Sequence, residues 1–319
     1  MKQTILLTGK AGQIGSHLYP LLRNLGDVLA TDRNELDLSN ADALRKMVRD
    51  LRPNLIVNAA AYTGVDAAET DESNAYAINA SAPGVFAEEA KRIGAGMVHY
   101  STDYVFDGMK RTPYTESDTT HPINVYGRTK LAGEQAVRDS GASHLIFRSS
   151  WVYATRGRNF MLTILRLASE LEELKIVRDQ VGAPTCAQHI AAATTRVLAY
   201  IQERNKDLSH ITEFAGTYHM SAAGQATWYD FAKAIIQEAQ PVSCGLPWLL
   251  AATHGRDLKV RRVLSISSEE FPSTTPRPSY SVLSNLQLTR RFGVALPDWR
   301  NQLQCCFAPE AVTSNPLPE

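Results

Sequence analysis

The first 150 residues alternate short apolar runs with longer stretches in which apolar side chains recur every three or four positions. Short apolar runs are typical of strands buried on both faces, and the longer spacing is typical of helices. The pattern predicts strands at 4–9, 27–32, 54–61, 96–106 and 144–153, and helices at 13–26, 39–53, 75–95 and 126–141. Such alternation predicts an α/β fold with a doubly wound, Rossmann-type parallel sheet covered by helices on both faces.

Two local signals refine these helices. Ser39 and Asp42 have the spacing of a capping box, so Ser39 is expected to open the helix that stops before Pro53. Pro83 is expected to bend the helix over 75–95 or to split it in two.

Beyond about residue 150 the pattern becomes less regular. It predicts helices at 159–174, 187–205 and 227–239, a strand and loop over 174–185, and a strand at 216–222. Prolines and polar residues become frequent from Pro241 onward. We therefore assign residues 1–150, with parts of 171–235, to the Rossmann domain. Residues 151–170 and 236–308 are assigned to a smaller, loop-rich α/β lobe, and 309–319 to a frayed tail.

Composition narrows the class of protein. Thirty-three basic and 33 acidic side chains cancel, which gives no general attraction to nucleic acid or to an anionic membrane. The apolar start is too short for a secretory signal, and no apolar window is long enough to span a bilayer. The cysteines (Cys186, Cys244, Cys305 and Cys306) lack the spacing of a zinc site or a disulfide framework. We expect a cytoplasmic, reduced protein that holds no metal.

Glycines at positions 9, 12 and 15 follow the first predicted strand and open the first predicted helix. In a dinucleotide-binding turn, Gly9 permits the tight turn, Gly12 lets backbone approach a pyrophosphate, and Gly15 allows close helix packing. A strand-to-helix turn without a ligand is the alternative, but the surrounding strand–helix–strand pattern favours a dinucleotide.

The second strand ends in a pair of opposite charges. Asp32 lies where an acid hydrogen-bonds an adenosine ribose, which favours NADH, whereas Arg33 next to it suits the 2′-phosphate of NADPH. A charged turn without a ligand is a third interpretation. Asp37 and Leu38 are expected to flank the adenine ring. The small residues 59–61 leave room for a cofactor close to the backbone.

Tyr126 and Lys130 lie four residues apart and therefore share a helix face. An ammonium beside a phenol favours phenolate, so we expect the pKa of Tyr126 to fall from its usual value toward working pH. Tyr126 would then donate a proton to a carbonyl oxygen as hydride reaches the carbon, and Thr102 would offer its hydroxyl to the same oxygen. A Tyr-x-x-x-Lys pair alone occurs by chance in many helices; the glycines and the strand-end "STD" make chance an unlikely explanation here.

At this point the chain resembles the extended short-chain dehydrogenase/reductases, and within them the family of dTDP-4-dehydrorhamnose reductases. The resemblance spans nearly the whole chain, and it is carried by the segments "GKAGQIG", "RPNLIVNAAAYTGVDAAE", "VHYSTDYVFDG", "NVYGRTKLAGE", "HLIFRSSWVYA", "RDQVGAPT", "TWYDFA" and "RPSYSVLSN". It implies reduction of the 4-keto group of a dTDP-6-deoxysugar by NADPH or NADH, which gives dTDP-L-rhamnose for cell-surface polysaccharide.

The resemblance also implies roles for individual residues. Tyr126 would be the proton donor, Lys130 would orient the nicotinamide ribose, and Thr102 would complete the triad. The substrate would contact Thr102, Asp103 and the flat face of Trp151. Arg277, in a proline-flanked loop, is our own candidate for the substrate diphosphate, with a surface arginine as the equal alternative. The cofactor would contact Gly9, Gly12, Gln13, Ile14, Gly15, Asp32, Arg33, Asp37, Leu38, Ala61, Tyr62, Thr63, Tyr126 and Lys130.

The chain differs from related enzymes at two places. Dehydratases of this superfamily have Asp-Glu after the Ser/Thr, but here Asp103 is followed by Tyr104, which disfavours dehydration. Some bacterial reductases bridge a dimer through magnesium held by glutamates, and the matching positions here are His17, Gln188 and Arg300. An arginine repels a hard cation, so we expect a monomer or a dimer that is not bridged by metal.

Two other functions remain open on sequence grounds. A regulatory subunit of the same fold, as in the beta subunit of methionine adenosyltransferase, would bind a partner protein without turnover. An epimerase would keep its NAD bound and show no net consumption of cofactor.

Overall fold

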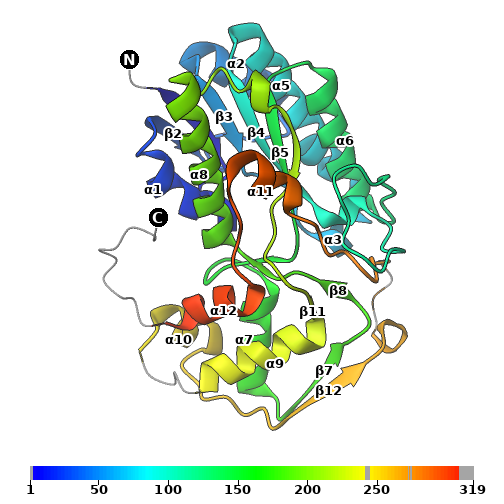
Figure 1. The fold of residues 1–319 in the computed structure, drawn as a ribbon. Helices are drawn as coiled ribbons and strands as arrows, with labels where there is room; N and C mark the ends of the chain where they lie inside the picture. The colour runs from blue at the N-terminus through cyan, green and yellow to red at the C-terminus, as the bar shows by residue number, and fades with distance from the viewer. Residues whose placement is uncertain (1–2, 241–244, 272, 274, 309–319) are drawn as a thin grey trace.

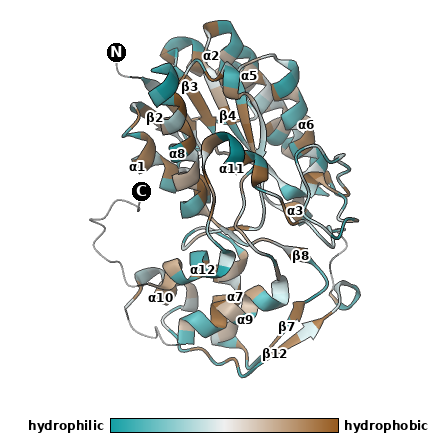
Figure 2. Cartoon of the chain, viewed as in Figure 1, coloured by the Kyte–Doolittle hydropathy of each residue, from teal (hydrophilic) through white to brown (hydrophobic). Residues whose placement is uncertain are grey.

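The computed structural model describes residues 3–240, 245–271, 273 and 275–308, which form two halves joined by several crossing segments (Figure 1). The upper half is built on a six-stranded parallel sheet of order β10-β5-β4-β3-β1-β2. Its strands are β1 (Thr4–Thr8), β2 (Asp27–Thr31), β3 (Leu55–Asn58), β4 (Gly96–Thr102), β5 (His144–Ser149) and β10 (Gly216–His219). The predicted Rossmann-type fold is thus confirmed, and the strands are mostly hydrophobic (Figure 2).

Helices cover both faces of the sheet because successive strand side chains point to opposite sides. Ile5 and Leu7 pack with α1 (Gln13–Leu22), α8 (Ala187–Asn205) and α11 (Leu286–Phe292). Leu6 packs on the other face, with α2 (Ala41–Leu51), α5 (Ala82–Ile93) and α6 (Val125–Asp139). Residues 286–296, which we had assigned to the smaller lobe, contribute Leu288 to the first of these cores.

The lower half has its own hydrophobic core. Its elements are α7 (Phe160–Glu170), β7 (Glu173–Val177), α9 (Trp228–Ala239), α10 (Pro247–Thr253), β12 (Arg262–Ile266) and α12 (Trp299–Phe307). The last part of the chain, predicted to be rich in loops, carries the short elements α10, β12, α11 and α12 between its loops. The expected tail over 309–319 lies outside the described residues.

Shorter elements lie between these helices and strands. They are α3 (Val65–Ala68), α4 (Glu72–Tyr76), the 3₁₀ turn η2 (Asp103–Val105), β6 (Val152–Tyr153), β8 (Val181–Gly182), β9 (Thr185–Cys186), η3 (Thr212–Phe214), β11 (Ala226–Thr227) and η5 (Ser268–Glu270). β6 pairs with β9 and β8 pairs with β11, so the chain crosses between the halves next to Trp151. Within the described part of the chain, none of the helices is long and apolar enough to cross a membrane.

Two predicted helix boundaries need correction. Asn40 rather than Ser39 caps α2, and its side chain accepts a hydrogen bond from the Ala43 amide at 3.0 Å. Ser39 instead donates its amide and its hydroxyl to the Asp37 carboxylate. The helix expected over 75–95 is divided by a π-helical turn, η1 (Ala77–Ser81), and α5 then begins with Pro83 in its first turn. A π turn inside a helix often marks a functional site.

Candidate active site

The glycine turn has the shape that a dinucleotide requires. Gly9 has φ +75°, and a Cβ atom there would lie 2.8 Å from the Ala60 amide nitrogen. A Cβ on Gly15 would lie 2.1 Å from the Gly9 carbonyl oxygen, so only glycine lets α1 start this close to β1. Gly12 precedes α1, which has no side-chain cap and begins Gln13, Ile14, Gly15. The amides of this first turn are therefore available to an anionic group.

Charged residues surround the end of β2. Asp32 accepts a hydrogen bond from the Asn34 amide at 2.9 Å, and Arg33 beside it is exposed. Lys10, which we did not single out from the sequence, reaches the same turn and pairs with Glu35 at 2.6 Å. Two basic and two acidic side chains thus lie where the adenosine end is expected. Asp37 is held by Ser39, whose hydrogen bonds lower the pKa of Asp37, and Leu38 packs against the core.

The segment after β3 is fixed by a buried amide. Asn79 lies in the π turn and accepts a hydrogen bond from the Tyr62 amide at 2.9 Å, while its Nδ2 donates to the Tyr62 carbonyl at 3.0 Å. The same Nδ2 donates to Thr129 Oγ1 of α6 at 3.0 Å. Asn79 therefore joins the expected cofactor segment Ala61–Tyr62–Thr63 to the helix that carries Tyr126. Asn79 could not be identified from the sequence because a π turn leaves no clear residue pattern.

The N-terminus of α6 is held firmly. The cap residue Asn124 accepts a hydrogen bond from the Gly127 amide at 2.8 Å, and its Nδ2 donates to the Pro276 carbonyl at 3.0 Å. Glu69 accepts from the Val125 amide at 2.8 Å. These bonds connect the first turn of α6, and with it Tyr126, to segments from distant parts of the chain.

Tyr126, Thr102 and Lys130 come together at the carboxyl end of β4. The Thr102 hydroxyl lies near enough to the Tyr126 phenol to oppose the rise in its pKa, and the Lys130 ammonium donates to the Tyr100 carbonyl at 2.6 Å. Burial raises the pKa of Tyr126 to about 12, whereas burial lowers the pKa of Lys130 to about 8, partly offset by Glu134. The expected fall in the Tyr126 pKa is therefore wrong, because desolvation of the phenolate outweighs the opposing effect of the Thr102 hydroxyl.

A phenol with this pKa keeps its proton at neutral pH. That suits a general acid, which must carry a proton until negative charge develops on the substrate oxygen. Thr102 also accepts a hydrogen bond from the Tyr104 amide at 3.2 Å, which orients its hydroxyl at the strand end.

Asp103 is buried beside this pair. Its carboxylate accepts hydrogen bonds from Thr102 at 3.1 Å and from Ser150 at 2.9 Å, and it is only 2% exposed. Burial raises the pKa of Asp103 to about 6, although hydroxyls of Ser281, Ser150 and Thr102 oppose that rise. Tyr104, where dehydratases have their second acid, instead packs its ring edge-on against Tyr126 at 5.8 Å.

Trp151 and Arg277 adopt arrangements that the sequence did not predict. Trp151 has φ +47° and stacks on Trp228 of α9, so one indole face is already covered. Arg277 forms two hydrogen bonds to the Asp66 carboxylate, at 2.7 and 2.9 Å, and one to Ser273 at 2.6 Å. Its side chain is 20% exposed and paired, so it is not a free surface arginine.

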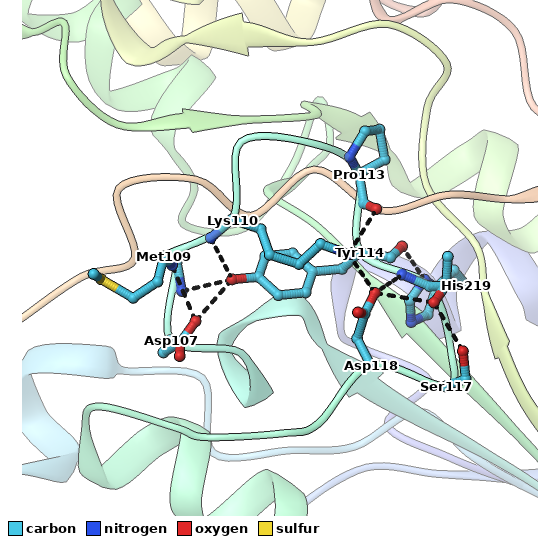
Figure 3. A network of polar contacts seen from close by, with 10 residues as sticks. Asp107, Met109, Lys110, Pro113, Tyr114, Ser117, Asp118 and His219 are labelled. Carbon is cyan, nitrogen blue, oxygen red and sulfur yellow. Dashed lines mark hydrogen bonds and ion pairs between the residues drawn. The ribbon is translucent and has the colours of Figure 1, made fainter.

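The loop after η2 is braced by Tyr114, as Figure 3 shows. Its buried hydroxyl donates to Asp107 at 2.8 Å and accepts from the amides of Gly108 and Lys110. At the other end of the residue, the Tyr114 carbonyl lies 3.1 Å from the ring nitrogen Nδ1 of His219, on β10. The Tyr114 ring also stacks on Phe106. These contacts fix the loop that leaves Thr102 and Asp103.

The described residues contain no group of three or more His, Cys, Asp or Glu side chains arranged to hold a metal ion. What they contain is a glycine-lined strand-to-helix turn and a Thr–Tyr–Lys set at the same edge of a parallel sheet. This combination defines the short-chain dehydrogenase/reductase class, in which a nicotinamide cofactor lies across the strand ends.

Comparison with known proteins identifies the family. The model of the RmlD substrate binding domain family matches residues 1–312, and the chain belongs to this family. A dTDP-4-dehydrorhamnose reductase from Burkholderia thailandensis is 47% identical over 302 residues, which cover 95% of this chain and 97% of that protein. One from Escherichia coli K12 is 41% identical over 300 residues, covering 93% and 94%.

Solved structures have the same fold over nearly the whole chain. A crystal structure of dTDP-4-dehydrorhamnose reductase from Bacillus anthracis in complex with NADP superposes with a TM-score of 0.82 at 35% identity, covering 96% of this chain and 99% of that one. The Clostridium acetobutylicum protein of the same name gives 0.81 at 36% identity, covering 94% and 97%.

Proposed function

We propose that this protein reduces the 4-keto group of dTDP-4-dehydro-L-rhamnose to give dTDP-L-rhamnose, a nucleotide sugar for cell-surface polysaccharide, with NADPH or NADH as cofactor. The observation that carries the proposal is the Thr102–Tyr126 hydroxyl pair at the same sheet edge as the Gly9–Gly15 turn. The relatives named dTDP-4-dehydrorhamnose reductase, which are 37–47% identical and align over 92–95% of this chain, support the same substrate.

The residues present fit a dinucleotide. The open first turn of α1 would bind its pyrophosphate, the segment fixed by Asn79 would line its middle, and Lys130 would hold the nicotinamide ribose. Bound there, the reduced nicotinamide supplies hydride. At the adenosine end of the cofactor, the acidic Asp32 and Glu35 would favour the free ribose of NADH. The basic Lys10 and Arg33 would favour the 2′-phosphate of NADPH.

Tyr126 would donate its proton to the sugar oxygen at C4, and Thr102 would hydrogen-bond that oxygen. Because burial raises the pKa of Tyr126 to about 12, the phenol remains protonated until charge develops on the substrate. The ammonium of Lys130 would then stabilise the phenolate that remains.

Substrate recognition would involve Asp103, Trp151 and Arg277. The Arg277 guanidinium donates from Nη2 to both oxygens of the Asp66 carboxylate, and the same donor could bind the oxygens of a phosphate. We infer that the diphosphate of the nucleotide sugar replaces Asp66 at Arg277.

A direct assay tests the function. Purified protein is mixed with dTDP-4-dehydro-L-rhamnose and NADPH, or with NADH, and both cofactor absorbance and sugar products are followed. Stoichiometric oxidation of cofactor with formation of dTDP-L-rhamnose is expected. Absence of oxidation would indicate a binding or regulatory protein, and isomerised sugar without net oxidation would indicate an epimerase; either result would refute the proposal.

A further inference from the structure

Two cysteines that lie far apart in sequence meet at the junction of the two halves. The Sγ atoms of Cys186 and Cys306 are 3.7 Å apart, and the residues are 2% and 9% exposed. Cys186 ends β9 and caps the N-terminus of α8, which covers the six-stranded sheet. Cys306 lies near the end of α12, in the core of the lower half. A bond between them would join the two halves.

The backbone at this junction is well held. The Cys186 amide donates to Gln302 Oε1 at 2.9 Å, and Gln302 Nε2 donates to the Pro297 carbonyl at 2.8 Å. Tyr153, on β6, pairs in register with Cys186 on β9. The start of α8, the strand that follows Trp151, and α12 are thus in direct contact around the two thiols.

The environment distinguishes the two sulfurs. The contact with Cys306 lowers the pKa of Cys186 more than burial raises it, and the same contact raises the pKa of Cys306. Cys186 also lies at the N-terminus of a 19-residue helix, where partial positive charge favours a thiolate. Cys186 is therefore the nucleophile of the pair and Cys306 the resolving thiol.

The two sulfur atoms are already near bonding distance. A disulfide has an S–S length of about 2.0 Å, so the sulfurs need to approach by roughly 1.7 Å. Cys305, the neighbour of Cys306, is exposed and lies outside this pair. It offers a matched control in the same helix.

We propose that Cys186 and Cys306 are a site of reversible oxidation, at which hydrogen peroxide converts the two thiols into an intramolecular disulfide. The Cys186 thiolate attacks one peroxide oxygen, the O–O bond breaks, and a sulfenic acid forms with release of one water after proton uptake. The Cys306 sulfur then attacks the sulfenic sulfur, and the hydroxyl leaves as a second water. Two thiols lose two hydrogens, and one peroxide becomes two waters.

The product would link α8 to α12. Because the cross-link closes a loop of more than 100 residues, it restricts the unfolded chain strongly. The oxidised protein is expected to melt at a temperature higher by roughly 5–15 °C, and a thiol reductant should reverse the change.

The test uses the full-length protein treated with stoichiometric hydrogen peroxide. The intact mass should fall by about 2 Da, as expected for loss of two hydrogens, and peptide mapping without reduction should find Cys186 linked to Cys306. Cys305→Ser should retain both the link and the rise in melting temperature. Cys186→Ser and Cys306→Ser should lose both.

Three results would overturn the proposal. They are a link between Cys305 and Cys306, irreversible sulfinic acid without any link, and a mapped link that leaves the melting temperature unchanged. Because the peptide mapping uses the wild-type chain, it shows whether Cys186 and Cys306 are linked even if a serine variant does not fold.

Discussion

Trp151 and Trp228 lie face to face, with ring centroids 3.4 Å apart and ring planes 2° from parallel. The contact joins the segment after β5 to α9 of the lower half. A Cβ on Gly182 would lie 2.3 Å from the Trp151 ring, so glycine is required beneath it. Trp228 Nε1 donates to Gln180 at 3.1 Å, which fixes the second indole. The residue expected to contact substrate is thus supported from two sides.

Replacing Trp228 by alanine should disturb Trp151 without touching the cofactor. Aromatic pairs contribute about 0.5–1.5 kcal/mol beyond burial, so KM for the nucleotide sugar should rise roughly 3–10-fold. The dissociation constant for NADPH, measured by calorimetry, should not change. Trp248→Phe, in a ring contact with Phe307 elsewhere in the lower half, is the control. An unchanged KM in Trp228→Ala would show that the stack does not support substrate binding.

Tyr126→Phe removes the proposed proton donor. Turnover should fall by about two to four orders of magnitude, the range for loss of a general acid, while affinity for NADPH stays similar. Steady-state kinetics and cofactor titration measure the two quantities. Tyr229→Phe, which removes a phenol on α9, should behave like wild type. Turnover near that of wild type in Tyr126→Phe would contradict the assignment.

Lys130→Ala should reduce both turnover and cofactor affinity. Its ammonium is expected to contact the nicotinamide ribose and to stabilise the Tyr126 phenolate, and in the free protein it holds the Tyr100 carbonyl. The same kinetic and binding measurements apply. A change in only one of them would show that Lys130 has a single role.

Asp103 should make stability depend on pH. Because its pKa is raised from 3.8 to about 6, the folded protein holds this proton more tightly than the unfolded chain. The resulting stabilisation is present below about pH 4 and is lost as pH rises through 6, with a magnitude up to about 3 kcal/mol. Asp103→Asn should remove this slope in urea unfolding between pH 4 and 7. Asp42→Asn, an exposed carboxylate on α2, should leave the slope unchanged; equal slopes in Asp103→Asn and wild type would exclude the effect.

Arg277 and Asp66 should have opposite effects on substrate binding. Arg277→Ala removes the proposed diphosphate ligand, and KM for the nucleotide sugar should rise by about 10–100-fold. Asp66→Asn frees the guanidinium and should lower KM or leave it unchanged. Kinetics at fixed NADPH measures both. A similar rise of KM in both variants would indicate that the pair only maintains the fold.

Several features could be predicted without coordinates. The strands at 55–58 and 144–149, the helix of Tyr126 and the turn at Gly9 follow from short-range patterns, because strand and helix periodicity and glycine φ are local properties. Their order places the expected site residues at one sheet edge, since carboxyl ends of parallel strands meet there. The cap of α2 was missed by one residue because Ser39 and Asn40 are both good caps.

Other features depend on contacts between distant segments. Periodicity did not reveal α10 to α12, since these short helices owe their stability to packing in the cores formed by the two halves. Three contacts likewise join residues that no local sequence pattern connects. They are the contacts of Asn79 with Tyr62, of Asp66 with Arg277, and of Trp151 with Trp228.

The sequence by itself determined the fold class, the family and the positions of Thr102, Tyr126 and Lys130, because local spacing and motif order suffice for these. Only the tertiary structure decided the proton affinity of Tyr126. The Tyr126 pKa rises rather than falls because burial removes water from the phenolate, and burial is a property of the folded chain rather than of the Tyr-x-x-x-Lys spacing.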